Sequence, residues 1–72
     1  MMKNTIGNNI RKYRMRNGWN QDALALQLNL KRQTISSYER GISLPDIYIL
    51  LQLAKIFQVE LEDLVESVEF DS

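Results

Sequence analysis

The sequence predicts an all-α domain of five short helices. Two observations carry this prediction: apolar residues recur at the three- and four-residue spacings of helix faces, and residues that start or stop helices separate these stretches. No stretch alternates convincingly as a β-strand, apart from a weak hint at Val68 and Phe70. With 72 residues, of which 44% are hydrophobic, the chain suffices for one domain with its own core.

The first two helices are delimited by their ends. The first is predicted over residues 5–17, and Gly18 stops it because glycine accepts the left-handed conformation common after a helix. Its apolar face consists of Ile6, Ile10 and Tyr13. Asn20 is a good N-cap for the second helix, predicted over residues 21–28. Asn29 tolerates positive φ, so a tight turn of about three residues leads to the next helix.

Three further helices complete the predicted fold. The third spans residues 32–40 and stops at Gly41. Pro45 cannot continue a helix, and Asp46 caps the fourth. The inward side of the fourth helix is predicted to consist of Ile47, Leu50, Leu53, Ala54 and Phe57. The last helix, near residues 61–66, uses Leu61, Leu64 and Val65. The domain is expected to cover residues 1–66, followed by an acidic tail over residues 67–72.

Composition excludes several kinds of chemistry. The chain has no cysteine and no histidine, which excludes disulfides, thiolate and imidazole nucleophiles and the usual zinc ligand sets. We therefore expect no metal and no other cofactor. The N-terminus lacks the apolar stretch of a signal peptide, and the longest apolar region, residues 47–57, is too short to span a bilayer. We expect a cytoplasmic protein with no membrane partner.

The formal net charge of zero conceals two oppositely charged parts. Residues 1–41 carry eight Lys and Arg against two Asp and Glu, a net charge of +6. Residues 42–72 carry one Lys against seven Asp and Glu, a net charge of −6. Such a chain can offer a basic face to a polyanion while it stays neutral overall. Ordinary solvated charge is the alternative explanation.

The third predicted helix is unusually polar. Only Ile35 and Tyr38 form its apolar stripe, so the rest of its surface must face something polar. Two helices of about eight residues joined by a tight turn, with the second polar outside and basic at its start, are what a helix-turn-helix DNA reader requires. A helix that enters the major groove of DNA needs hydrogen-bonding groups on its outer face.

At these positions the sequence resembles the phage-repressor and Cro-like (XRE-type) family of helix-turn-helix proteins, over about residues 6–65. The matches at fixed spacing are Ile6, Gly7, Ile10, Tyr13, Arg14, Gly18, Gln21, Leu24, Ala25, Leu28, Thr34, Ile35, Ser36, Tyr38, Glu39, Arg40, Gly41, Pro45, Leu50, Ala54 and Leu64. The resemblance implies a lambda-repressor-like domain with the helix-turn-helix at the second and third helices. It implies a sequence-specific regulator of transcription, a repressor, that binds double-stranded DNA.

The resemblance also implies roles for particular residues. The groove-facing positions of the third helix are Arg32, Gln33, Thr34, Ser36 and Ser37. Gln21 donates to a DNA phosphate or supports the recognition helix, and Arg14 pairs with Glu39. Lys31 departs from the family pattern of Ser or Thr as N-cap, and the missing cap costs ~1 kcal/mol. Lys31 either lies against a phosphate or is solvated.

The chemistry of these side chains suggests how DNA is read. Arg32 can give two parallel hydrogen bonds to guanine O6 and N7, and Gln33 can do the same for adenine N6 and N7. Either can bind phosphate instead. Ser36 and Ser37 are short, which favours contact with phosphate, water or a thymine methyl through neighbours. The remaining candidates for phosphate contact, or for solvated charge, are Arg11, Arg16 and Arg40.

One short recognition helix covers too few base pairs for useful specificity in a genome, so a homodimer on a near-palindromic operator is expected. Its recognition helices would lie ~34 Å apart. Ile49 and Ile56 lie close together on the fourth helix, beyond its inward side. The candidate dimer surface consists of Tyr48, Ile49, Ile56, Val68 and Phe70. The competing explanation is that the tail folds over Ile49 and Ile56 within one chain.

Two other classes of function remain to be weighed. The only dense ionisable cluster is Glu60, Glu62, Asp63 and Glu66. These residues alternate with apolar ones as in an amphipathic helix, and the isolated glycines form no phosphate-binding loop, so no enzyme is expected. The alternative function is that of an antitoxin-like or other interaction module, which binds a protein partner through the acidic C-terminal half.

Overall fold

The computed structural model describes residues 4–66, which form five helices and no strand. These helices are α1 (Thr5–Arg16), α2 (Gln21–Leu28), α3 (Arg32–Glu39), α4 (Ile47–Phe57) and α5 (Leu61–Val65). The predicted all-α class and the order of the five helices are confirmed. Helices α1, α3 and α5 each end one residue earlier than predicted. The hint of a strand at Val68 and Phe70, and the predicted tail as a whole, lie outside the described residues.

The N-cap residues of three helices supply side-chain caps, and at α5 the Asp63 side chain accepts from the backbone N–H of Glu60 at 2.9 Å. The side-chain oxygens of Asn4, Asn20 and Asp46 each accept a hydrogen bond from a backbone N–H in the first turn of α1, α2 and α4. These bonds satisfy donors that a helix start leaves without intrahelical partners. At the other end of α2, Asn29 has φ 58° and takes the left-handed conformation that the sequence predicts. The chain therefore reverses sharply between α2 and α3.

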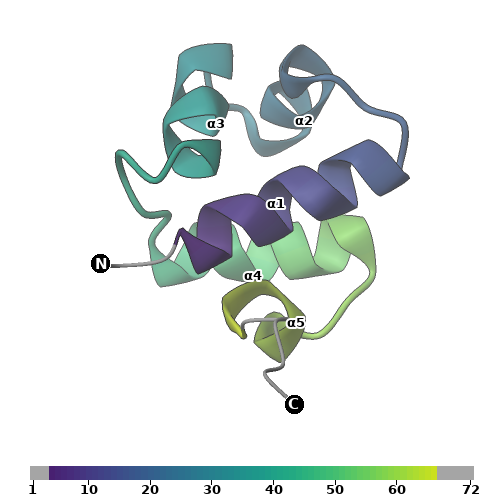
Figure 1. Ribbon diagram of the computed structural model, residues 1–72. Helices are drawn as coiled ribbons and strands as arrows, with labels where there is room; N and C mark the ends of the chain where they lie inside the picture. The colour runs from purple at the N-terminus through teal and green to yellow at the C-terminus, as the bar shows by residue number, and fades with distance from the viewer. Residues whose placement is uncertain (1–3, 67–72) are drawn as a thin grey trace.

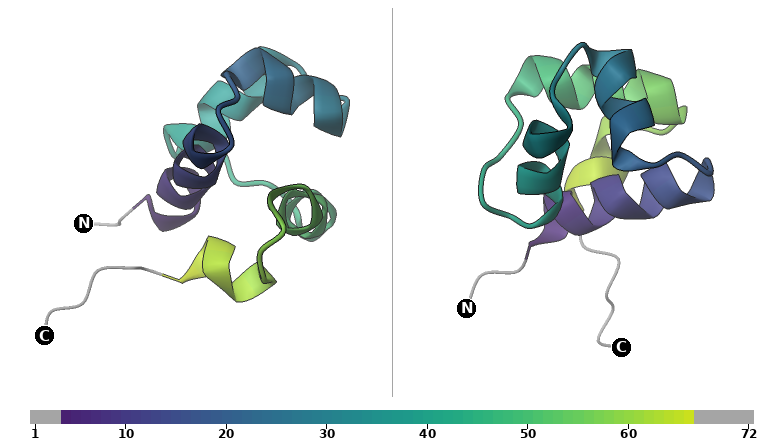
Figure 2. Two further views of the ribbon diagram at one scale, coloured as in Figure 1. Left: turned by 90° about the vertical axis from the view of Figure 1, so that its right-hand side faces the viewer. Right: turned by 90° about the horizontal axis from the view of Figure 1, so that it is seen from above.

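The helices are arranged around α1 and α4. Figure 1 shows α2 and α3 together at one end of the molecule and α5 at the opposite end, and the views of Figure 2 agree. Helix α1 packs against both α3 and α5, and α4 packs against α1, α2 and α5. The helix-turn-helix pair is thus supported from inside by α1 and α4.

The core draws on every helix. The largest fully buried side chains are Ile10, Leu24, Ile35, Leu53 and Leu64, one from each of the five helices. Full burial of a side chain of this size contributes roughly 1.5–3 kcal/mol. Since each helix contributes such a side chain, the position of α3 depends on the whole domain.

Two predicted core positions are wrong. Ile47, expected on the inward side of α4, is 50% exposed, and Val65 of α5 is also exposed. Ile47 is the first residue of α4, and the buried residues of this helix begin one turn later, at Leu50. Val65 directly follows the buried Leu64, and neighbouring helical residues point about 100° apart.

Between residues 4 and 66, none of the helices combines the length and the apolar character that crossing a membrane requires.

Candidate nucleic-acid interface

A tight turn joins α2 to α3. The backbone N–H of Leu30 donates to the carbonyl of Ala25 at 2.9 Å, which closes the C-terminal end of α2. Lys31 follows with an extended backbone and stands at the N-cap of α3, where its side chain makes no capping hydrogen bond. The first turn of α3 thus lacks the side-chain acceptor that most helices have. Lys31 itself is exposed.

The outer face of α3 is polar and accessible. Arg32, Gln33 and Arg40 are exposed, whereas Ile35 and Tyr38 are buried. The half-buried members of the predicted groove-facing set are Thr34, Ser36 and Ser37. Residues 33, 36, 37 and 40 follow the spacing of one helix face, so the structure brings most of the predicted positions together on one surface. Thr34 lies at its flank, next in the helical row to the buried Tyr38.

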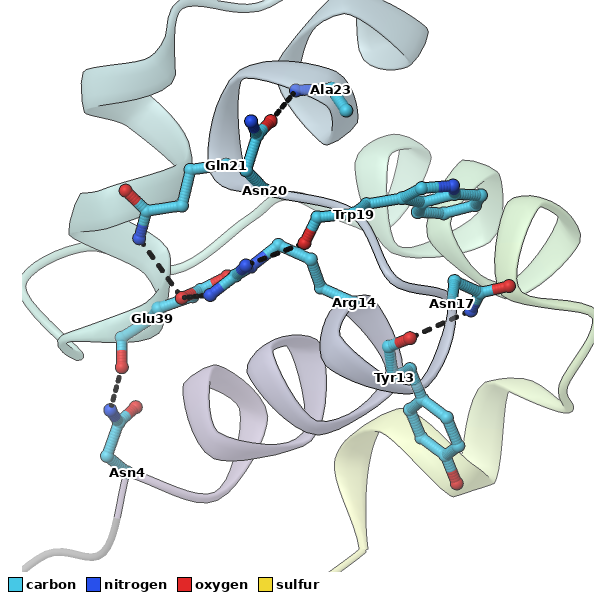
Figure 3. A network of polar contacts seen from close by, with 9 residues as sticks. All are labelled: Asn4, Tyr13, Arg14, Asn17, Trp19, Asn20, Gln21, Ala23 and Glu39. Carbon is cyan, nitrogen blue, oxygen red and sulfur yellow. Dashed lines mark hydrogen bonds and ion pairs between the residues drawn. The ribbon is translucent and has the colours of Figure 1, made fainter.

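Arg14 and Glu39 form an ion pair beneath this face. The Arg14 Nε and Glu39 Oε2 atoms lie 2.6 Å apart, and Nη2 donates to Oε1 at 3.1 Å. The side chains are only 12% and 4% exposed. Arg14 also donates from Nη1 to the carbonyl of Trp19 at 2.9 Å, as Figure 3 shows. The pair that the resemblance implies is therefore present, and it ties α1 to α3.

Two more side chains converge on Glu39. Gln21 donates from Nε2 to Oε1 of Glu39 at 3.1 Å, and Asn4 donates from Nδ2 to its backbone carbonyl at 2.7 Å (Figure 3). Of the two roles expected for Gln21, support of the recognition helix is thus visible, and a phosphate contact stays a prediction. Glu39 is a buried carboxylate whose charge is satisfied by donors from α1 and α2.

Close contact between α1 and α3 also depends on a glycine. A side chain at Gly7 would clash with the backbone carbonyl of Tyr38. Burial, and in second place the negative charge of Asp46, raise the pKa of the Tyr38 phenol above its usual value of 10.0. The inner face of α3 is therefore tightly packed and carries a neutral phenol, in contrast to its outer face.

Other predicted contacts are more dispersed. Arg16 is the last residue of α1, and its guanidinium carbon lies 5.5 Å from the centre of the Tyr13 ring. This cation–π contact gives Arg16 a partner within the domain. Arg11 is exposed on α1.

The predicted dimer surface is only partly accessible. Tyr48 is 73% exposed, whereas Ile49 and Ile56 pack against the core, which explains their spacing without a partner chain. Val68 and Phe70 lie outside the described residues. Sequence reasoning missed a further exposed apolar residue of α4, Leu51. Together with Ile47 and Tyr48 it forms what we call the α4 apolar surface. The signal was present, because residues 47, 48 and 51 follow helical spacing.

Sequence reasoning also missed a partner of Arg32. The Asp22 Oδ1 atom on α2 lies 3.7 Å from Nε of Arg32. Asp22 lies in the first turn of α2, where its negative charge is also favourable for the helix. No local pattern predicts this contact, because it depends on how α2 and α3 dock.

A tightly packed inner face, a polar outer face and a sharp turn to α2 define α2 and α3 as a helix-turn-helix. Residues 10–64 match the model of a helix-turn-helix family. The chain belongs to this family, and its resemblance to phage-repressor and Cro-like proteins is confirmed.

Similar proteins fall in the same class. The HTH-type transcriptional regulator YgzD of Bacillus subtilis is 30% identical over 56 residues, which cover 78% of this chain and 85% of the relative. The crystal structure of the P22 c2 repressor in complex with a synthetic operator has a TM-score of 0.79 at 30% identity, covering 85% of this chain and 92% of that one. The restriction-modification controller protein C.AhdI from Aeromonas hydrophila has a TM-score of 0.76 at 28% identity, with coverage of 83% and 91%. The lambda-repressor-like fold class is therefore confirmed.

Proposed function

We propose that this protein is a sequence-specific regulator of transcription, a repressor that binds a near-palindromic operator as a homodimer through the major groove. The observation that carries the proposal is the two-sided character of α3. Its outer face presents Gln33, Ser36, Ser37 and Arg40, while Glu39 on its inner face is held by Arg14 and Gln21. Such a regulator acts in the cytoplasm and needs neither a catalytic group nor a membrane partner.

Recognition would divide between base contacts and phosphate contacts. Arg32 and Gln33 lie at the start of α3, the part of a recognition helix that reaches base edges. Bidentate bonds from Arg32 to guanine and from Gln33 to adenine discriminate by ~1–3 kcal/mol each against a wrong base. Lys31 and Arg40 flank this segment, where their charges can meet phosphates. Thr34, Ser36 and Ser37 add short hydrogen-bonding groups.

The ion-pair network favours binding because it fixes the reading surface in advance. A helix anchored by buried charge-assisted hydrogen bonds does not need to be ordered when DNA arrives, so less binding energy is lost. The P22 c2 repressor, whose structure contains an operator, supports the same use of this fold here.

We assign the dimer contact to the α4 apolar surface rather than to Ile49 and Ile56. Ile47, Tyr48 and Leu51 are all exposed, and burial of such a patch between two copies would remove it from water. Ile49 and Ile56 already pack against the core. Val68 and Phe70 remain predicted contributors.

The decisive test is selection of bound sites from random double-stranded DNA. We expect enriched sites with two inverted half-sites whose centres lie about 10–10.5 base pairs apart. Failure to retain any duplex at low ionic strength would overturn the proposal.

A second test concerns the recognition helix itself. The double substitution Arg32→Ala and Gln33→Ala should abolish retention of the selected site and leave the melting temperature nearly unchanged, because both side chains are exposed. The alternative function, an antitoxin-like module that binds only a protein partner through the acidic C-terminal half, predicts instead that duplex binding is absent or unaffected by this change.

A further inference from the structure

The carboxylate of Asp22 lies beside the first residue of the recognition helix. Its Oδ1 atom is 3.7 Å from Nε of Arg32, which is longer than a hydrogen bond but within ion-pair range. The Asp22 side chain is not needed as a cap, because Asn20 fills that role by accepting from the N–H of Ala23 at 2.8 Å. Asp22 is therefore free to face α3.

A carboxylate at this position is unfavourable for general DNA binding. Within residues 21–40, all of which the structure describes, the acidic residues are Asp22 and Glu39, and Glu39 is buried against Arg14. Asp22 is thus the exposed negative charge of the helix-turn-helix, where it repels DNA phosphates. The Asp22 and Arg32 side chains are 75% and 55% exposed, so water screens their attraction and the pair contributes little to folding stability.

We propose that Asp22 is a positioning residue that directs Arg32 toward guanine. This inference rests on the proposed function. A guanidinium carries five N–H donors, and a contact through Nε leaves both Nη groups for the O6 and N7 acceptors of guanine. Restraint of this long side chain reduces the rotamers that must be lost on binding. Partial neutralisation of its charge also makes phosphate a weaker competitor for it. Asp22 thereby lowers general affinity and raises base preference.

The test compares affinity with preference in the same variants. The wild-type chain is first used to select its site, and Arg32→Ala then identifies the guanine whose replacement no longer matters. For Asp22→Asn, we expect binding to random duplex to strengthen about two- to threefold at low salt. We expect its preference for that guanine to fall about two- to fivefold, the range that an exposed ion pair can contribute. Preference at the other positions of the site should not change.

Two controls separate positioning from charge alone. Glu62→Gln removes an exposed carboxylate of α5 and changes the net charge equally, so it should leave the guanine preference intact. Asp22→Asn in the Arg32→Ala background should cause no further loss of preference. A role of Asp22 in α2 alone, through the helix dipole, would lower the melting temperature and leave base preference unchanged.

Distinct outcomes overturn the inference and the proposed function. If the wild type selects a site and Asp22→Asn discriminates guanine as well as wild type does, the positioning role is wrong and DNA recognition stands. The positioning role is also wrong if the asparagine variant loses preference equally with and without Arg32. If the wild type retains no duplex, the proposed function fails and this role fails with it.

Discussion

Arg14 on α1 and Glu39 on α3 meet in a nearly dry, two-point ion pair, with distances of 2.6 Å and 3.1 Å between their nitrogen and oxygen atoms. The attraction must compensate for the removal of both charges from water, which is why the additional donor from Gln21 matters. The same contact that positions the recognition helix is therefore one whose disruption is costly.

Replacement of Arg14 by methionine should destabilise the domain. The Glu39 carboxylate would stay buried with only Gln21 as a side-chain donor, and loss of one partner of a buried pair costs about 3–5 kcal/mol. The measurement is the free energy of unfolding in urea. Arg11→Met, at an exposed position of the same helix, should change it by less than about 0.5 kcal/mol. Equal small effects of both substitutions would contradict the structural role of the pair.

Lys31→Ser tests two properties separately: the stability of the domain and the contribution of Lys31 to DNA binding. Serine supplies the side-chain acceptor that Lys31 does not provide, so the free energy of unfolding should rise by about 1 kcal/mol. The logarithm of the DNA-binding constant falls linearly with the logarithm of the salt concentration. If Lys31 contacts a phosphate, the slope of this line should decrease in magnitude by about 0.9 in the serine variant. An unchanged slope would identify Lys31 as a solvated residue.

Charge on the α4 apolar surface should prevent self-association. Tyr48→Glu combined with Leu51→Glu places two carboxylates where a second copy would bury apolar side chains, and sedimentation equilibrium should then show a monomer. Affinity for a two-half-site duplex should fall about a hundredfold or more, since the two sites are no longer linked. Leu26→Glu, at an exposed position of α2, is the control for the oligomeric state. A double variant that still forms dimers would place the interface elsewhere.

Titration of the Tyr38 phenol should make the free energy of unfolding depend on pH in the alkaline range. Because burial and Asp46 raise the pKa of its phenol above 10.0, the unfolded chain loses this proton at lower pH than the folded one. The contribution is fully present below the unfolded pKa, and the free energy of unfolding falls as pH rises above about 10. Tyr38→Phe should reduce this loss in unfolding measured between pH 8 and about 11, whereas Tyr48→Phe, at an exposed site, should retain it. Identical curves for both variants would argue against the effect of burial.

Local signals predicted most of the fold. Caps such as Asn20 and the left-handed Asn29 depend on a few neighbouring residues, so they can be read from sequence. The exposure of Ile47 could not be read from the sequence, because apolar spacing does not reveal at which turn of a helix burial begins. The pair of Asp22 and Arg32 escaped for a related reason, since it forms only when α2 and α3 dock. The polar outer face of α3 was predictable because, of all the residues in this helix, only Ile35 and Tyr38 are apolar enough for the core.

The distribution of the core has a consequence for the use of this domain as a module. Ile10, Leu53 and Leu64 are as fully buried as the core side chains of α2 and α3. We therefore expect that α2 and α3 do not fold independently of the other helices. Residues 21–40, placed alone on another scaffold, would lose their packing against α1 and α4. Amide exchange in α3 should then proceed only through global opening of the domain, at the same free energy as in α1.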